Sequence, residues 1–352
     1  MQKWFKHSLG LVCLSSLFFS QQVAAEGRLT VYCTVQNALC EKVTTQFGEK
    51  YDVKTEFVHG GTETIFGKIK AEKDNPQADF WYGGTIEPHF QAGELGLLEA
   101  YRSPKQAEIL PQFKSLMAEK GDLTSAMAQK GNFTSVAYML VLGFGVNTQK
   151  LAQLGLPAPQ SWEDLLKPEY KGEIQLPDPR ASGTTYTIMA TLIQLWGEEK
   201  AFNYLKKLNE NVSQYVKSNL VTANLSRGES AVSVGFVHAY ATEKEKGAPV
   251  ETVIPQGKTG YSLGGASIIK GARNLDNAKL FMDFVLSKEV QEMPWREFGL
   301  YQIPTNANAE SSPKSVDPKK LDFVQFDFVK FGSKDEGKRL INKWLADIKL
   351  SK

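Results

Sequence analysis

The sequence is poor in the residues that most often carry catalysis or bind metals. Its 352 residues include three cysteines and four histidines, without a His-x-x-x-His or Cys-x-x-Cys pair. Those absences argue against the common zinc sites. The stretch "GKT" at 257–259 has Thr252 where a phosphate-binding loop needs glycine, and "GFGVNT" at 143–148 matches the dinucleotide fingerprint only in part. We therefore expect a protein that is not an enzyme and that uses no cofactor.

Long apolar runs are also scarce, and the clearest one lies near the start of the chain. Lys3, Lys6 and His7 precede an apolar run from Leu9 to Phe19, and "QVAA" then supplies small residues for cleavage. This pattern predicts a secretory signal peptide over residues 1–25, because the run is too short to span a membrane. The residues before Cys13 lack the small residue that a lipoprotein signal would place there. We expect a soluble, exported mature chain in the periplasm.

The charge balance excludes some classes of partner. Removal of Lys3 and Lys6 would leave 39 basic residues against 39 acidic ones. A mature chain with a net charge near zero has no basic excess for nucleic acid or for an anionic membrane. We therefore expect neither as a partner.

Cleavage would also leave a single pair of cysteines, Cys33 and Cys40. An even pair in an oxidising compartment is more often bridged than free, so we expect a disulfide. Two buried thiols are the alternative.

Strand-like and helix-like patterns alternate along the chain. β-Branched "RLTVYCTV" is followed by a stretch in which Leu39, Val43, Phe47 and Tyr51 recur at helical spacing, and then by the strand-like "VKTEFVH" and the helical "TETIFGKIKAEK". The apolar run at 136–146 predicts a long strand, followed by a second set of alternating units. Near the end, "AKLFMDFVLSKEVQEM" predicts a helix. This order favours an α/β fold of two lobes with largely parallel sheets and crossover segments between them.

Three clusters of small residues stand where a strand pattern changes to a helix pattern. They are "GGT" at 60–62, "GGT" at 83–85 and "SGTT" at 182–185. Glycine allows a ligand to approach the backbone, and a helix start offers unpaired amide groups and the positive end of the helix dipole. Each cluster alone is an ordinary helix cap, but together they favour an anion site shared by two lobes.

Two further residues fall at the same predicted edge. Thr34 follows the first strand, and His238 ends the strand "AVSVGFV". Ligands of open α/β sheets bind beyond the carboxyl ends of the strands, which favours a ligand role for both. A hydrogen-bonded structural histidine is the alternative for His238. The predicted ligand-binding residues are Thr34, Gly61, Thr62, Gly84, Thr85, Ser182, Gly183, Thr184, Thr185, Tyr186, His238 and Ser262. Of these, Tyr186, His238 and Ser262 are predicted to contact the part of the ligand that is distal to its anionic group.

These residues carry a resemblance that covers nearly the whole mature chain. The sequence resembles periplasmic substrate-binding proteins of ABC importers, in the type II, ferric-binding-like subclass. The most specific matching stretch is "PQSWEDLLKPEYKGEIQLPDPRASGTTY". The stretches "YGGTIEPHFQAGELGLLEAY" and "GFVHA" are most similar to the branch that binds hexose phosphates. The resemblance implies a monomer with an interlobe cleft and a permease in the inner membrane as partner. We expect one lobe from 26–137 with about 262–305, and the other from about 138–261 with about 306–352.

The ligand expected from the resemblance is a small phosphorylated organic solute, such as a hexose 6-phosphate, captured by hinge closure. Ferric iron is the alternative, but ferric-binding relatives supply adjacent tyrosines where this chain reads "HAYATE", with Tyr240 alone. Hexose-phosphate binders carry carboxylates where this chain has Ala239 and Ser262, which leaves a phosphonate or a glycerophosphodiester open.

Overall fold

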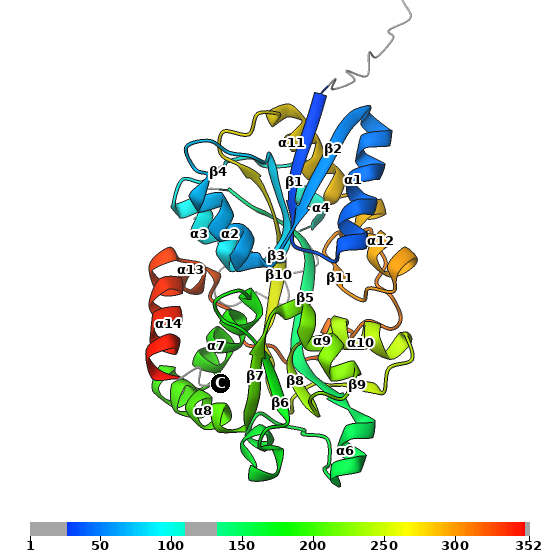
Figure 1. The fold of residues 1–352 in the computed structure, drawn as a ribbon. Helices are drawn as coiled ribbons and strands as arrows, with labels where there is room; N and C mark the ends of the chain where they lie inside the picture. Colours follow the sequence, from blue (N-terminus) through cyan, green and yellow to red (C-terminus); the bar gives the residue numbers. More distant parts are fainter. Residues whose placement is uncertain (1–26, 110–131, 349–352) are drawn as a thin grey trace, which may run out of the picture.

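The computed structural model describes residues 27–109 and 132–348. The signal peptide predicted over residues 1–25 lies outside the described residues. The described chain forms a mixed α/β protein of two lobes, with the N-terminal elements in one lobe and the middle of the chain in the other (Figure 1).

The first lobe is built on a sheet in which three parallel strands lead to an antiparallel fourth. The sheet strands are β1 (Gly27–Cys33), β2 (Val53–His59), β3 (Phe80–Thr85), β4 (Leu98–Glu99) and β10 (Tyr261–Ile269). In this sheet β1 lies between β2 and β3, and β10 runs antiparallel beside β3. The helices of this lobe are α1 (Asn37–Tyr51), α2 (Thr62–Ala71), α3 (Ile86–Glu94), α4 (Gln106–Ile109), α11 (Leu275–Val285) and α12 (Lys288–Phe298).

The second lobe repeats the arrangement with a smaller parallel sheet. Its strands are β6 (Ile174–Pro177), β7 (Val212–Val216), β8 (Val232–Phe236) and β9 (Val250–Val253). Here β6 lies between β7 and β8, parallel to both. The helices are α6 (Thr148–Leu154), α7 (Gly183–Trp196), α8 (Glu198–Asn211), α9 (Ser218–Ser226), α10 (Val237–Glu245), α13 (Phe328–Phe331) and α14 (Lys334–Asp347).

One long strand, β5 (Ser135–Asn147), joins the two sheets and is buried along its whole length. Its first half pairs with β10, and its second half, from Leu142, pairs with β8. The short β11 (Ile303–Pro304) also pairs with β5. The strand expected at 136–146 is therefore confirmed. The lobe boundaries expected from the sequence stay a prediction, since a strand shared by both sheets belongs to neither lobe alone.

Local sequence patterns explain most of these elements. The helical spacing of Leu39, Val43 and Phe47 places all three on the fully buried face of α1. One expectation was wrong, because the stretch at 278–293 belongs to two helices rather than one. Helix α11 ends at Val285, and α12 begins at Lys288. The Ser287 hydroxyl caps α12 by accepting a hydrogen bond from Val290 N at 3.4 Å.

The strand ends of the two lobes face each other across the middle of the molecule. In the first lobe β2 and β3 lead into α2 and α3, and in the second lobe β6 and β8 lead into α7 and α10. The carboxyl ends of parallel strands are where open α/β sheets bind ligands. Within residues 27–109 and 132–348, no helix has both the length and the apolar character to cross a membrane.

Candidate functional site

The first lobe contributes a wall in which a glycine lies between two hydroxyl groups. Gly84 has φ of +83°, a conformation that favours glycine. A Cβ atom on Gly84 would lie 2.5 Å from Thr62 Oγ1 and 2.8 Å from Thr34 Oγ1. The ends of β1 and β3 and the start of α2 thus bring three of the predicted residues together, although they are distant in sequence.

The second lobe contacts this wall through the start of α7. A Cβ atom on Gly183 would lie 2.1 Å from Thr85 Oγ1, and one on Gly61 would lie 2.9 Å from the carbonyl oxygen of Ala181. Only glycine allows these approaches without a shift of the neighbouring chain. All three small-residue clusters therefore meet where the two lobes touch.

Helix α7 begins with features suited to an anion. The Ser182 hydroxyl caps the helix by accepting a hydrogen bond from Thr184 N at 3.2 Å, and the first turn contains no acidic residue. The amide groups of a first turn have no partners within the helix, and the dipole of a 14-residue helix adds partial positive charge there. Together with the half-buried Thr184, this end of α7 can hold a phosphoryl group or another oxyanion.

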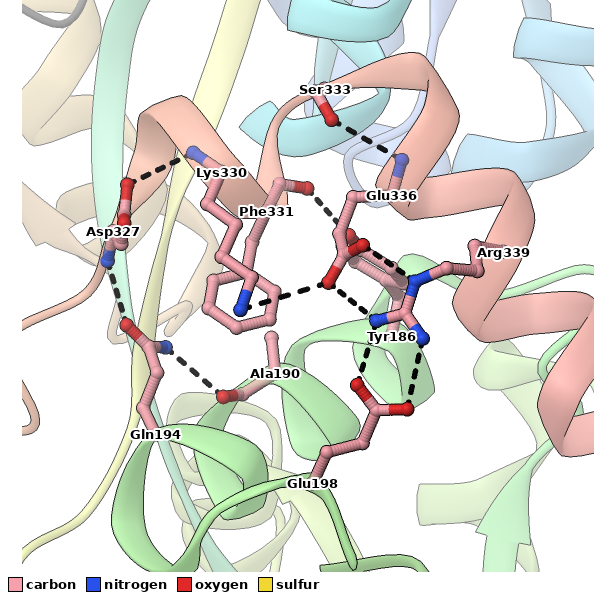
Figure 2. Close-up of polar contacts among 10 residues, drawn as sticks. All are labelled: Tyr186, Ala190, Gln194, Glu198, Asp327, Lys330, Phe331, Ser333, Glu336 and Arg339. Atoms are coloured by element: carbon pink, nitrogen blue, oxygen red, sulfur yellow. Dashed lines mark hydrogen bonds and ion pairs between the residues drawn. The ribbon is translucent and has the colours of Figure 1, made fainter.

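Three of the predicted side chains are already engaged with the protein itself. The hydroxyl of Thr185 donates to Pro177 O at 2.6 Å, and the Tyr186 hydroxyl donates to Phe331 O at 2.5 Å (Figure 2). Ser262 is fully buried and donates to the Glu87 carboxyl at 3.1 Å. The hydroxyls of all three therefore already have protein partners, and direct contact of these side chains with a ligand stays a prediction.

Glu87, in the first turn of α3, is a buried acid that the sequence analysis missed. Its carboxyl accepts hydrogen bonds from Ser262 of β10 and, at 3.5 Å, from Thr187 of α7, so it joins both lobes. Complete burial raises its pKa to about 7, although the hydroxyls of Ser262, Thr85 and Thr187 partly offset this effect. Nothing in the local sequence pattern around "GGTI" predicts that the next residue, Glu87, is buried. Only its contacts in the folded protein show this.

Two buried polar atoms near the lobe contact lack an ordinary hydrogen bond. They are Thr85 Oγ1, beside the Glu87 carboxyl, and His238 Nδ1, in the first turn of α10. Burial lowers the pKa of His238 to about 4, so its ring is neutral at pH 7. An unpaired buried polar group costs free energy unless something binds it, which supports a ligand contact for both residues.

His238 also lines a cavity of about 270 Å³ between the lobes. The cavity is bounded by Met139 and Val141 of β5, by α10, and by the chain around Tyr301. The lining also includes Lys244, Glu245, Glu251, Thr252, Lys314 and Ser315. A lining of apolar and polar side chains can contact both the carbon skeleton and the polar groups of a solute.

The predicted bond between Cys33 and Cys40 is present and ties the end of β1 to α1. It encloses Thr34, one of the two hydroxyl residues beside Gly84. Among the described residues, no group of three or more His, Cys, Asp or Glu side chains could hold a metal ion.

Comparisons with known proteins agree with this geometry. The family model of bacterial extracellular solute-binding proteins matches residues 88–331. An uncharacterized protein of Haemophilus influenzae is 50% identical over 340 residues, which is 96% of this chain and 95% of the relative. A putative 2-aminoethylphosphonate-binding periplasmic protein of Salmonella typhimurium is 26% identical over 263 residues, covering 71% of this chain and 70% of the relative.

Two solved structures are similar along nearly the whole described chain. The periplasmic binding protein P5PA has 77% sequence identity and a TM-score of 0.87, covering 92% of this chain and 100% of its own. The periplasmic binding protein AfuA from Actinobacillus pleuropneumoniae, with exogenous fructose-6-phosphate bound, has 53% identity and a TM-score of 0.86, covering 92% of this chain and 99% of its own. Periplasmic solute-binding proteins of this kind are not enzymes. The chain therefore belongs to the bacterial extracellular solute-binding protein family, as a periplasmic component that works with an ABC permease.

Proposed function

We propose that this protein captures a small phosphorylated organic solute, such as a hexose 6-phosphate, between its lobes and delivers it to an inner-membrane permease. The phosphoryl group would be bound by Thr34, Thr62, Gly84 and Thr85 of the first lobe and by Ser182, Gly183 and Thr184 of the second, with Gly61 allowing the lobes to approach. His238 would contact the distal part of the solute.

The observation that carries this proposal is the meeting of three Gly–Thr turns from two lobes around the buried Thr85 hydroxyl, which makes no ordinary hydrogen bond. Hydroxyls and backbone amides bind a phosphoryl group without fixed cations, as helix N-termini do elsewhere. The family relationship and the fructose-6-phosphate bound to the similar AfuA support the same ligand class.

Hinge closure follows from how the contacts are divided. Thr85 and Gly183 come from different lobes, so their contact exists only when the lobes are together. A ligand held by both lobes would favour that closed form over an open one. The bending segments would be β5 near 136–146 and the chain at 252–265, because these cross between the lobes. We expect a monomer that becomes more compact with ligand, which small-angle scattering measures.

A phosphonate is the second candidate. The Salmonella relative is named for 2-aminoethylphosphonate, and Ala239 and Ser262 stand where hexose-phosphate binders carry carboxylates. A phosphonate presents the same oxygens to the Gly–Thr turns, so the two candidates differ only in the organic part.

The test is calorimetric titration of the protein and of its Thr85→Val variant with fructose 6-phosphate, 2-aminoethylphosphonate, unphosphorylated fructose and ferric citrate. Loss of a hydrogen bond to a charged group costs about 1.5–3 kcal/mol, so affinity for the phosphorylated or phosphonate ligand should fall about tenfold to a hundredfold. The Thr85 hydroxyl makes no hydrogen bond of ordinary geometry, although it acts on the nearby Glu87 carboxyl, so the free energy of unfolding should fall by less than in a variant that loses an ordinary buried hydrogen bond.

Thr44→Val is the matched control. Thr44 is equally buried, but its hydroxyl donates to Cys40 O within α1 at 2.8 Å. That variant should lose stability and keep its affinity. Equal binding of fructose and fructose 6-phosphate, or unchanged binding by Thr85→Val, would overturn the proposal.

A further inference from the structure

The peptide group between Gly83 and Gly84 is held at both of its polar ends. The carbonyl oxygen of Gly83 lies 3.0 Å from Nε2 of His89. The N–H of Gly84 donates to the hydroxyl of Tyr138 at 2.9 Å. Because both atoms belong to one peptide plane, the two hydrogen bonds together set its orientation.

This peptide needs such restraint more than most. Gly83 and Gly84 have φ of +87° and +83°, and neither has a Cβ atom to hinder rotation of the plane between them. A flip of the plane would point the Gly83 carbonyl away from His89 and the Gly84 N–H away from Tyr138. It would also move Gly84, which packs directly against the hydroxyls of Thr34 and Thr62.

His89 is built as a hydrogen-bond donor toward the turn. A carbonyl oxygen can only accept, so Nε2 carries the proton, and Nδ1 then accepts from the Ser267 hydroxyl at 2.8 Å. The ring is fully buried and stacks on Trp81 with 3.6 Å between centroids. A Cβ atom on Gly265 would lie 2.4 Å from the imidazole ring, so β10 leaves room for the histidine by having glycine there.

Tyr138 approaches from the other side, on the strand that the two lobes share. Its ring lies over Gly264, where a Cβ atom would come within 2.2 Å of the ring. Burial raises the pKa of Tyr138, so its hydroxyl keeps its proton while it accepts from Gly84. The turn is thereby fastened to β5, where the sheets of the two lobes join.

We propose that His89 and Tyr138 are positioning residues that lock the Gly83–Gly84 peptide and so keep Gly84 between the hydroxyls of the first-lobe wall. This rests on the proposed function, in which that wall binds the phosphoryl group, but the lock itself is a property of the protein without ligand. Because Tyr138 lies on β5, its hydrogen bond to Gly84 fixes the position of this wall against β5 as well as against α3, which carries His89.

The first experiment needs no ligand. In Tyr138→Phe the ring stays and the acceptor for Gly84 N–H is lost, so the Gly84 amide should exchange with solvent at least tenfold faster by NMR, and the methyl signals of Thr34 and Thr62 should shift. Tyr204→Phe is the matched control, because its buried hydroxyl donates to Trp162 O at 2.6 Å in the second lobe. That control should lose similar stability and leave all three signals unchanged.

A milder variant tests the histidine side. Ser267→Ala leaves the Gly83 carbonyl, which requires the Nε2–H tautomer, but removes the hydrogen bond that holds Nδ1 and so restrains the ring less. The ¹⁵N shifts of His89 should still report Nε2–H, while the Nδ1 shift should move to that of a nitrogen without a hydrogen bond, and the Gly84 amide should exchange faster. Unchanged Gly84 exchange and unchanged threonine methyl signals in both variants would overturn the proposal.

The second experiment measures the consequence for binding, with fructose 6-phosphate and inorganic phosphate as probes. For a probe that the parent binds, Tyr138→Phe should weaken binding about tenfold, whereas Tyr204→Phe should not. Unchanged affinity in Tyr138→Phe would refute a positioning role even if Gly84 exchanges faster. If neither probe binds the parent protein, the proposed function fails, and the ligand-free signals alone decide whether the lock exists.

Discussion

The first turn of α7 and the contact between α8 and α14 are held by different kinds of interaction. The first turn is capped by Ser182, packs Gly183 against Thr85 and carries no charged side chain. At the contact of the two other helices, the Arg339 guanidinium of α14 pairs with Glu198 of α8 at 2.7 Å and with Glu336 of α14 at 2.8 Å (Figure 2). The charges of this region thus stay on the exposed surface, away from the end that contacts the first lobe.

This difference has a physical reason. Exposed ion pairs are screened by water and contribute little, while buried polar groups are costly unless each has a partner. A fixed carboxylate at the first turn would also repel an anionic ligand, and two acids of the first lobe, Glu87 of α3 and Glu63 of α2, bear on this region. Burial raises the pKa of each to about 7, which keeps both largely uncharged below about pH 7 and reduces that repulsion. Substitutions at the first turn of α7 and at the contact between α8 and α14 should therefore differ in size and in what they change.

The largest effect is expected for Glu87→Gln. The folded protein keeps the Glu87 proton up to a pKa of about 7, whereas the unfolded chain loses it near the ordinary pKa of 4.5. The stability of the parent therefore falls as pH rises between these values and levels off above them. At about 1.4 kcal/mol for each pH unit, the neutral amide should stabilise the protein by about 3 kcal/mol at pH 8 and by little at pH 4.5.

Urea unfolding at both pH values measures this effect, and Glu292→Gln is the opposing control. Burial would raise the pKa of Glu292, but hydrogen bonds from Glu310 N–H and Arg296 lower it. That variant should lose stability at pH 8. An equal effect of Glu87→Gln at both pH values would show that the acid is not protonated in the folded protein.

The disulfide beside Thr34 should have the next largest effect. Cys33 and Cys40 are separated by 7 positions, and closing so short a loop removes about 2–3 kcal/mol of chain entropy from the unfolded state. The Cys33→Ser, Cys40→Ser double variant should lose about that much stability. Thiol labelling of the unfolded, unreduced parent should detect neither cysteine; labelling of both would contradict the structure.

Gly183→Ala tests whether the uncharged end of α7 closes against the first lobe. The new Cβ would lie 2.1 Å from Thr85 Oγ1 in the closed form, while a helix position itself favours alanine over glycine. Affinity for the ligand should fall at least tenfold, scattering should show a more open form, and stability should hold. Adding Thr85→Ala should restore compaction, and a compact Gly183→Ala protein would refute the closure contact.

The smallest effect is expected at the contact between α8 and α14. Arg339→Gln removes the ion pairs with Glu198 and Glu336, and because all three side chains are partly exposed, stability should fall by less than about 1 kcal/mol. Ligand affinity should not change. A larger loss of affinity than in Thr85→Val would reverse the contrast between this contact and the first turn of α7.

Much of the fold was predictable because it depends on local patterns. The helical spacing of Leu39, Val43 and Phe47 and the apolar run at 136–146 each specify an element from neighbouring residues alone. The Gly–Thr turns were visible for the same reason, since small residues between a strand and a helix have a local cause. The cysteine pair followed from the expected compartment and the even count of residues.

The direction of individual side chains was not predictable in this way. Thr184 and Thr185 are neighbours in the same first turn, yet only Thr185 reaches back to Pro177 O, because the helix rotates successive side chains by about 100°. Glu87, His89 and Tyr138 act through partners that lie far along the chain, such as Ser262, Ser267 and Gly84. By itself the sequence determined the elements, the order of the turns and the bonded cysteines. Only the tertiary structure decided which hydroxyls remain unpaired where the lobes meet. That outcome depends on contacts between residues far apart in the sequence, which local patterns do not predict.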